Sequence, residues 1–300
     1  MKKATLFHNP NAGEKDFSKD ELLGIIKKNG FDVSYASIKQ ENWERIQENT
    51  DFLIIAGGDG TIRRVTKALM KRQRIEKQFP VAILPHGTAN NIATTLGIEG
   101  SPTEIIKSWK KSSLKSLDIG MVHGLDKEMF FLEGCGFGIF PRLMKVMEKM
   151  EIDIGDSVEH KLKVALAVLY EIVLNYTPHA CKIVADGVKQ TGKYLMVEVM
   201  NTRSIGPNLE LSTSSDPGDG EFEIVLIPEE HKDKFADYLL DQINGKEAAY
   251  AFTVLKATKI EIKWEGKDMH VDDERLKLKD PIVITIDVLP GMMDFMVKTS

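Results

Sequence analysis

The chain has 300 residues, of which 42% are hydrophobic, enough for one large domain or two medium domains with buried cores. Its net charge of −5 argues against a nucleic-acid-binding protein. No apolar run approaches the ~20 residues of a membrane-spanning helix, and Met-Lys-Lys-Ala-Thr leads into a strand pattern instead of a signal segment, so we expect a cytoplasmic protein.

Residues 1–120 alternate short apolar runs, which predict strands, with longer patterns that predict helices. Strands are predicted at 4–7, 32–36, 52–56 and 81–84, and helices at 18–29, 41–48, 61–72, 89–96 and 102–110. Such alternation predicts an α/β fold: a three-layer domain with a mostly parallel sheet.

After Asp118 the pattern changes to short strands separated by turn signals. Strands are predicted at 130–133, 182–184, 195–200, 222–226, 260–264 and 282–286, with one helix at 158–175. This pattern predicts an antiparallel β-sandwich domain. The helix is apolar nearly all round over 162–174, which fits either a buried packing helix or a slot for acyl chains.

The segment 51–61 joins a strand to a glycine-rich turn. The apolar run Phe52 to Ala56 lacks polar alternation, as in a strand covered on both faces. Gly57, Gly58 and Gly60 let the backbone turn sharply and approach a ligand, and the following helix N-terminus suits a phosphate. Asp59 would repel phosphate unless a cation lay between them, which indicates Mg²⁺ or a proton-accepting base. The alternative is an ordinary turn in which Asp59 caps the helix.

Two further loops have the same character. The strand at 81–84 runs into residues 85–91, and the first strand ends in residues 9–13. Parallel strands bring the loops at their carboxyl ends to one edge of the sheet, where open α/β folds bind ligands. Three such loops favour a ligand-binding edge over unrelated turns.

Several motifs occur in order along the chain: Asn9-Pro10 with Gly13, Gly57 to Thr61, Pro85 with Gly87 to Asn90, Asp118 to Gly120, Asp216 to Glu221, Asp272 to Glu274, and Leu289 to Gly291. This ordered set resembles the diacylglycerol kinase catalytic-domain family, which includes bacterial soluble lipid kinases and sphingosine kinases and is distantly related to NAD kinases. The resemblance covers essentially the whole chain. It implies a nucleotide-binding domain at 1–120, completed by 291–300, and a lipid- or acceptor-binding domain at 121–290.

The resemblance implies a phosphotransferase of lipid metabolism that uses ATP and Mg²⁺ and phosphorylates a lipid alcohol such as diacylglycerol. It also implies peripheral contact with a membrane and leaves a homodimer open. Ser37 stands where the family often has Thr. The residues expected to bind the nucleotide are Asn9, Pro10, Asn11, Ala12, Gly13, Ser37, Gly57, Gly58, Asp59, Gly60, Thr61, Ile62, Arg63, Gly87, Thr88 and Asn90.

Three acids are expected to be catalytic. Asp59 would organise Mg²⁺ through water, Asp118 would join the same network, and Glu274 would accept the proton of the lipid hydroxyl. Asp118 and Glu274 could instead be simple turn residues. A second, structural Mg²⁺ is expected at Asp216, Asp219 and Glu221, where the outer two could act through backbone carbonyls; the alternative is a solvated acidic turn.

Four residues depart from the family pattern. Arg63 and Arg64 stand where the family has Asn-Glu, Asn91 replaces an Asp, and Asp273 replaces the Gly of the Asp-Gly-Glu motif. The changes at Arg63, Arg64 and Asn91 make the site more positive, so either the acceptor is more anionic or catalysis is weakened. A nucleotide- or lipid-binding protein without turnover, and a kinase of a soluble acceptor, therefore remain alternatives. The basic run 63–77 fits either a solvated helix face or contact with anionic lipid.

Overall fold

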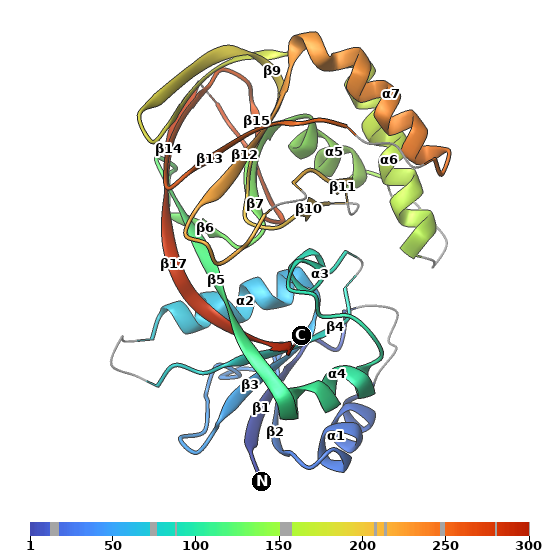
Figure 1. Cartoon of the computed structure of the whole chain (residues 1–300), viewed down its shortest axis with the longest axis vertical. Coiled ribbons are helices and arrows are strands. Elements are labelled where there is room, and N and C mark those ends of the chain that lie inside the picture. Colours follow the sequence, from blue (N-terminus) through green and yellow to red (C-terminus); the bar gives the residue numbers. More distant parts are fainter. Residues whose placement is uncertain are drawn as a thin grey trace. The chain divides into compact units, whose positions relative to one another are not determined.

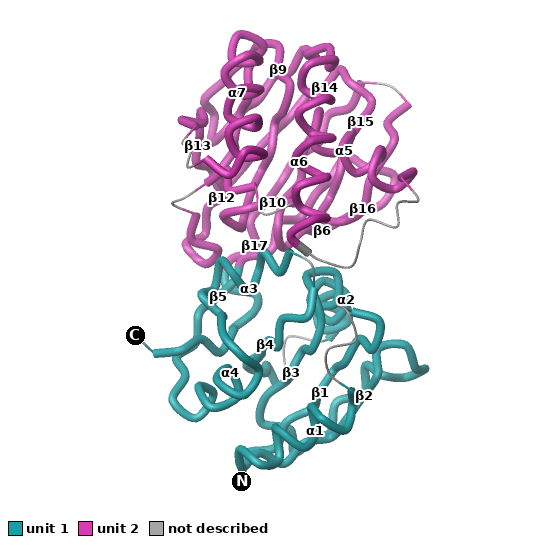
Figure 2. The backbone as a smooth tube through the Cα atoms, turned by 90° about the vertical axis from the view of Figure 1, so that its right-hand side faces the viewer, with its two compact units in different colours: residues 1–117, 291–300 teal, residues 118–290 magenta. Residues whose placement is uncertain are grey.

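The computed structural model describes residues 1–12, 18–72, 77–87, 89–150, 158–206, 209–212, 215–246, 250–279 and 281–299. The chain divides into two compact units (Figure 2). Unit 1 comprises residues 1–117 and 291–300, and unit 2 comprises residues 118–290. The chain passes between the units within two strands, β5 (Ser112–His123) and β17 (Ile282–Lys298).

Unit 1 is a three-layer α/β domain around a parallel sheet in the order β2–β1–β3–β4, with β17 beyond β4 (Figure 1). All six residues of β3 are buried, which explains the unbroken apolar run in the sequence. The strands are β1 (Lys3–His8), β2 (Asp32–Ser37), β3 (Phe52–Gly57) and β4 (Val81–Pro85).

Helices cover both faces of this sheet, with α1 and α4 together on one face and α2 on the other (Figures 1 and 2). Ser18 and Ser101 begin α1 and α4 with reciprocal capping boxes to Glu21 and Glu104, which satisfy the first N–H groups of each helix. The helices are α1 (Lys19–Lys28), α2 (Asp59–Met70), α3 (Asn91–Thr95) and α4 (Pro102–Ser108), and a 3₁₀ turn follows at Trp109–Lys111.

The helix predicted at 41–48 is wrong, because this segment forms turns. Asn42 has a φ of 57°, in the left-handed region that interrupts a right-handed helix. Trp43 packs edge-on against Phe7 with ring centroids 5.4 Å apart. A tertiary aromatic contact therefore fixes this segment, and a local sequence pattern does not reveal it.

Unit 2 is built on antiparallel strand pairs in the order β16–β15–β7–β9–β8–β14–β17, with β12 joining β9 to β13, and β5 joining β17 to β6. From Tyr194 to Met200 every residue of the central strand β9 is buried. The strands are β6 (Met129–Phe131), β7 (Gly134–Gly138), β8 (His179–Ala185), β9 (Val188–Met200), β12 (Phe222–Pro228), β13 (Thr253–Ala257), β14 (Lys259–Trp264), β15 (Asp268–Val271) and β16 (Glu274–Lys277), with a separate pair β10 (Ser204–Ile205) and β11 (Leu209–Glu210).

The sequence predicted one helix in this region, whereas the described part of unit 2 has three. They are α5 (Ile139–Met147), α6 (Val158–Asn175) and α7 (Lys232–Ile243). Neither α5 nor α7 begins with a side-chain cap, so the usual start signal is missing from the sequence. Their apolar residues form one core with β9, which includes Phe140 of α5, Leu169 of α6 and Phe235 of α7.

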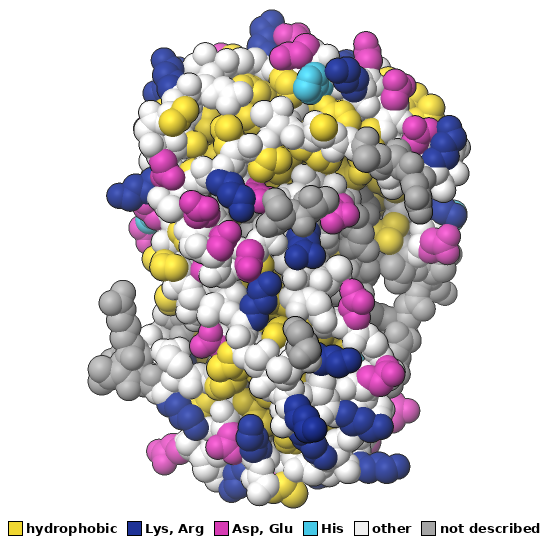
Figure 3. Space-filling view, in the orientation of Figure 1, with side chains coloured by type: hydrophobic (Ala, Val, Ile, Leu, Met, Phe, Trp, Pro, Cys, Tyr) yellow, Lys and Arg dark blue, Asp and Glu magenta, His cyan; other side chains and the backbone are white. Residues whose placement is uncertain are grey.

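Among the described residues, no helix has the length and apolar character needed to cross a membrane. The most apolar helix, α6, packs Ala165, Leu169 and Val173 into the core, while Leu174 is 43% exposed. On the surface, Lys and Arg side chains gather over the part of unit 1 that carries α1 and α4 (Figure 3).

Candidate functional site

Three loops meet at the carboxyl edge of the parallel sheet in unit 1. In the strand register, His8 of β1 lies opposite Ala56 of β3, and Gly57 lies opposite Pro85 of β4. Ser37, at the end of β2, lies opposite His8 on the other side. The loops that follow these strands therefore lie side by side, as the sequence predicted.

The glycines of the second and third loops allow close backbone contact. A Cβ atom on Gly58 would lie 2.8 Å from Cα of Gly87, and one on Gly87 would lie 2.7 Å from Cα of Gly58. A Cβ on Gly57 would lie 2.4 Å from Oγ1 of Thr61. The φ of Gly58 is −92°, so its requirement for glycine comes from this contact and not from backbone conformation.

Asp59 joins the same two loops through its carboxylate. The backbone N–H of Asn91 donates to Oδ2 at 2.9 Å, and that of Ile92 donates to Oδ1 at 3.1 Å. Asp59 therefore caps α3, the helix of the neighbouring loop, and α2 begins at Gly58 without a side-chain cap. Burial raises the pKa of Asp59, and the hydrogen bonds from Ile92 and Asn91 only partly offset this rise.

Asn9 and Asn90 hold the loops on either side. Nδ2 of Asn9 donates to Oγ1 of Thr61 at 3.2 Å. Asn90 has a φ of 55°, and its side chain accepts from the N–H of Gly87 at 2.7 Å and donates to the Gly87 oxygen at 2.8 Å. Both amides thus shape the loops, and both keep further capacity for hydrogen bonds to a ligand.

The remaining predicted nucleotide-binding residues differ in accessibility. Pro10, Asn11 and Gly60 are exposed, Ala12 is half-buried, and Ser37 is 7% exposed. The Ile62 side chain lies in the core, and the N–H groups of Thr61 and Ile62 donate to the Gly58 oxygen within the loop. Gly13 and Thr88 lie outside the described residues.

The two arginines that follow the loop differ in exposure: Arg63 is half-buried and Arg64 is exposed. The Arg64 guanidinium lies 5.6 Å from the centre of the Trp43 ring, a cation–π contact that accounts for this side chain. Arg63 is half-buried, and successive helix positions diverge by about 100°. Farther along the basic run, Arg72 and Lys77 lie over the Phe79 ring at 5.0 and 5.1 Å. These three contacts give part of the run a packing role.

Asp118 organises the acidic turn of unit 2. It is fully buried, and its Oδ2 accepts the N–H of Gly220 at 2.7 Å. Its own N–H donates to the Pro217 oxygen at 2.6 Å, and Nδ2 of Asn201 donates to its carbonyl oxygen at 2.9 Å. Through these hydrogen bonds Asp118 stabilises the turn at residues 217–220. Its catalytic role stays a prediction.

The expected metal-binding acids are Asp216, Asp219 and Glu221, and all three are exposed. Oδ1 of Asp219 accepts the N–H of Glu221, and its Oδ2 lies 3.6 Å from Nζ of Lys256. Across the described ranges, no three His, Cys, Asp or Glu side chains are grouped so as to hold a metal ion. The three carboxylates therefore do not form a metal-binding set, and a cation held by Asp219 with backbone carbonyls stays a prediction.

The Asp272–Glu274 turn owes its shape to Asp272, a residue whose role the sequence did not indicate. Its carboxylate accepts the N–H groups of Leu132, Glu133 and Gly134 at 2.9–3.2 Å. Asp272 also has the positive φ in this turn, 50°, whereas Asp273 does not. The missing glycine at position 273 therefore costs no backbone strain, contrary to what the family motif suggested.

Glu274 begins β16 on the exposed side of this turn. Its side chain is 40% exposed, and its Oε1 accepts from Nζ of Lys127 at 3.0 Å. An ion pair of this exposure contributes little to stability, because water screens it and both side chains lose rotamer freedom. The carboxylate is therefore accessible to solvent, and its catalytic role stays a prediction.

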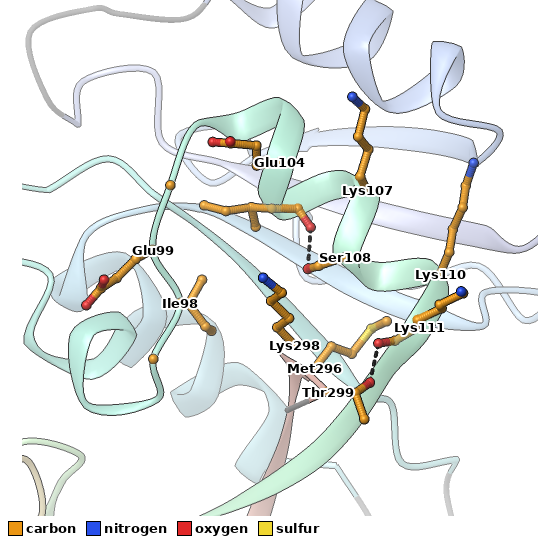
Figure 4. A pocket seen from close by; sticks show the side chains of 13 residues that line it. Ile98, Glu99, Glu104, Lys107, Ser108, Lys110, Lys111, Met296, Lys298 and Thr299 are labelled. Carbon is orange, nitrogen blue, oxygen red and sulfur yellow. Dashed lines mark hydrogen bonds between the residues drawn. The ribbon is translucent and has the colours of Figure 1, made fainter.

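Unit 1 also has a hollow of about 1000 Å³ along α4 and the end of β17. Figure 4 shows the Lys298 side chain extending toward the middle of the labelled residues, near Ile98 and Ser108, while Lys107 points away. None of the predicted site residues lines this hollow, so we do not include it in the site.

Both units of the chain match models of known protein families. Residues 3–122 match the family model described as diacylglycerol kinase catalytic domain, and residues 146–297 match that described as YegS C-terminal NAD kinase beta sandwich-like domain. The chain is 26% identical over 240 residues to a protein of Bacillus subtilis named diacylglycerol kinase, covering 76% of this chain and 74% of that protein. It is 32% identical over 115 residues to a Staphylococcus carnosus protein of the same name, 36% of each chain.

Among solved structures, a diacylglycerol kinase from Bacillus anthracis superposes with a TM-score of 0.72 at 23% identity, covering 98% of this chain and 96% of that one. At this identity the likeness concerns the fold alone. It confirms the predicted architecture: a largely parallel α/β part followed by antiparallel strands.

The contact between the two glycine loops gives a first prediction. Gly58→Ala should lower the free energy of unfolding by about 1–3 kcal/mol, because the added methyl group overpacks against the Gly87 backbone. Gly24→Ala in α1 is the matched control, since its Cβ would meet no atom within 4 Å. The control should gain about 0.5–1 kcal/mol. Equal melting temperatures of the two variants in a thermal unfolding experiment would show that the loops are not in close contact.

Proposed function

Since the chain belongs to the diacylglycerol kinase catalytic-domain family, we propose that it is an ATP-dependent lipid kinase that transfers the γ-phosphate to a diacylglycerol-like lipid alcohol. The observation that carries this proposal is the Asp59 carboxylate bridging two glycine loops at the carboxyl edge of a parallel sheet. Such a place suits phosphates, and a carboxylate there requires a cation.

In this proposal, the groups of unit 1 bind and orient the nucleotide. The glycine loops let backbone atoms approach the phosphates, and the Asn9–Thr61 pair presents a hydroxyl and an amide at the same edge. Arg63 is the arginine proposed to face an anionic group, since Arg64 contacts Trp43. Phosphoryl transfer needs mainly positioning and charge stabilisation from the protein, and these groups supply both.

The donor set at Asp59 fits Mg²⁺. Carboxylate oxygens have several lone-pair sites, so Asp59 could bind a cation directly or through water while it still accepts the N–H groups of Asn91 and Ile92. Mg²⁺ prefers oxygen ligands and usually keeps several waters. When bound, it would neutralise phosphate charge that the buried carboxylate would otherwise repel.

Glu274 of unit 2 is proposed to accept the proton of the acceptor hydroxyl. A base must present its carboxylate oxygen within hydrogen-bond distance of that hydroxyl. Glu274 lies on a short turn whose backbone Asp272 fixes, and its ion pair with Lys127 is half-exposed. The carboxylate is thus rigidly carried and accessible.

A groove in unit 2 supports a lipid acceptor. Its volume is about 860 Å³, and it runs along α5 and α6. In α6, Val164, Val168 and Ile172 line the groove. The residues that follow each of these, Ala165, Leu169 and Val173, pack into the core. The helix thus packs the domain with one face, and the groove along its other face supports the proposal of a slot for acyl chains. Because such an acceptor resides in a membrane, the proposal includes peripheral membrane contact.

The departures from the family pattern are compatible with turnover. Asn91 is 2% exposed, and its N–H donates to Asp59. An aspartate here would put a second carboxylate beside a buried one, which is unfavourable. Asp273 causes no strain, and Arg64 has a packing partner. The structural contacts of Asn91, Asp273 and Arg64 are thus compatible with the proposed kinase.

Replacing the bridging carboxylate tests the proposal. Asp59→Asn should lower kcat by about a hundredfold or more, because the preorganised charge that places the cation is lost. One hydrogen bond to α3 is also weakened, so we expect a loss of about 1 kcal/mol in unfolding free energy, which thermal unfolding would measure. The exposed Asp32→Asn serves as the control. Retention of a third of wild-type activity by Asp59→Asn would contradict the assignment.

Filling the groove tests the acceptor class. Ala167→Trp should raise KM for long-chain diacylglycerol about tenfold, a cost near 1.4 kcal/mol, and leave KM for ATP unchanged. Leu174→Trp, on the same helix but outside the groove, should change neither value. If each variant has the same KM for long-chain as for short-chain acceptors, the groove does not bind the acyl chains.

A further inference from the structure

Unit 2 contains a buried pair of ionisable side chains that the proposed phosphoryl transfer does not use. His270 on β15 and Glu198 on β9 are both 0% exposed. Nε2 of His270 lies 2.9 and 3.1 Å from the two carboxylate oxygens of Glu198. Burying charge costs free energy unless the charged groups are paired and hydrogen-bonded, so this pair needs an explanation.

Strand register explains how the pair forms. β7 lies between β9 and β15, and its Gly136 pairs with Glu198 on one side and with His270 on the other. Because Gly136 has no side chain, the two groups can meet across it. A Cβ atom there would lie 1.9 Å from Oε2 of Glu198. Phe140 of α5 covers the imidazole, with ring centroids 5.0 Å apart.

The second ring nitrogen of His270 contacts the turn that precedes Glu274. Nδ1 lies 2.8 Å from the backbone oxygen of Asp272. A carbonyl oxygen can only accept, so Nδ1 bears a proton and donates it. Burial by itself lowers the pKa of His270, but Glu198 and Asp272 more than reverse this, so the pKa lies above its ordinary value. Burial raises the pKa of Glu198 as well, so Nε2 and the Glu198 carboxyl hold a proton between them, while Nδ1 donates to the Asp272 oxygen.

The N–H, the carboxylate and the carbonyl of Asp272 therefore all form hydrogen bonds. Its N–H donates to the Gly134 oxygen at 2.8 Å, its carboxylate accepts backbone N–H groups of residues 132–134, and its carbonyl accepts from His270. The carbonyl is the last of these groups before the chain continues to Asp273 and Glu274. Its direction therefore sets the direction of the following peptide.

We propose that His270 is a positioning residue: by fixing the Asp272 carbonyl, it sets how the turn presents the Glu274 carboxylate to the acceptor hydroxyl. Glu198 orients the imidazole for this task, as carboxylates orient the histidines of metal sites through the far ring nitrogen. This inference rests on the proposed role of Glu274 in the kinase reaction.

Two replacements separate the two contacts of the imidazole. The amide nitrogen of Asn can take the place of Nδ1, so His270→Asn keeps a donor for Asp272 and loses the contact with Glu198. The longer Gln reaches the place of Nε2, so His270→Gln keeps a donor for Glu198 and loses the contact with Asp272. Both remove the same buried ring, so each controls for the general loss of packing.

We expect His270→Gln to lower kcat about tenfold or more with KM for ATP unchanged, since small misplacements of reacting groups cost that much. His270→Asn should stay within about threefold of wild type. Backbone hydrogen exchange in residues 268–277, measured without substrate, should be faster in the Gln variant than in the Asn variant. Equal kcat losses with equal exchange rates would overturn the proposal.

Two further variants cover the case in which the His270 variants do not fold and the case in which Glu274 is not the base. If both His270 variants fail to fold, Glu198→Leu keeps a buried side chain of similar size but gives Nε2 no hydrogen-bond partner, so it should still speed exchange in 268–277; unchanged exchange would count against the proposal. Glu274→Gln, assayed in parallel, tests the proposed function itself. If that variant keeps full activity, the role of Glu274 fails and the catalytic part of this inference fails with it, while the exchange data still show whether His270 holds the turn.

Discussion

The fold of both units depends on carboxylates that accept backbone N–H groups from loops far away in the sequence. Asp59 binds the start of α3, 32 and 33 residues away, and Asp118 binds Gly220, 102 residues away. Asp272 binds the turn at Leu132, 140 residues away. Each carboxylate loses hydration, and charge-assisted hydrogen bonds offset part of that cost. The loops cannot shift without leaving a desolvated charge unpaired, so the surfaces they form are preorganised.

This arrangement links stability to chemistry at the glycine loops. The Asp59 carboxylate joins the two loops and is also the group proposed to attract a cation to a phosphate. The Gly58–Gly87 contact brings the loops near enough for a side chain as short as aspartate to span them. The glycine-rich pattern therefore reflects packing between loops as much as space for a ligand.

The sequence predicted the architecture and the shared edge of the loops, because both follow from the order of strands and helices and from the geometry of parallel sheets. It did not predict that Asp59 caps the neighbouring helix, since that partner is a tertiary contact. The same holds for the turn segment around Trp43, where packing on Phe7 replaces the expected helix, and for the uncapped helices α5 and α7. The positive φ on Asp272, one residue before the position where the family has glycine, also depends on a distant partner.

The central claim is that this arrangement transfers phosphate from ATP to a lipid alcohol. The most direct measurement incubates the wild-type protein with Mg²⁺ and ATP labelled on the γ-phosphate, together with a panel of purified lipid alcohols in mixed micelles and with NAD as a soluble acceptor. The account predicts labelled product from an acceptor with acyl chains, diacylglycerol foremost. Label on NAD alone, or ATP binding by calorimetry without any labelled product, would contradict it.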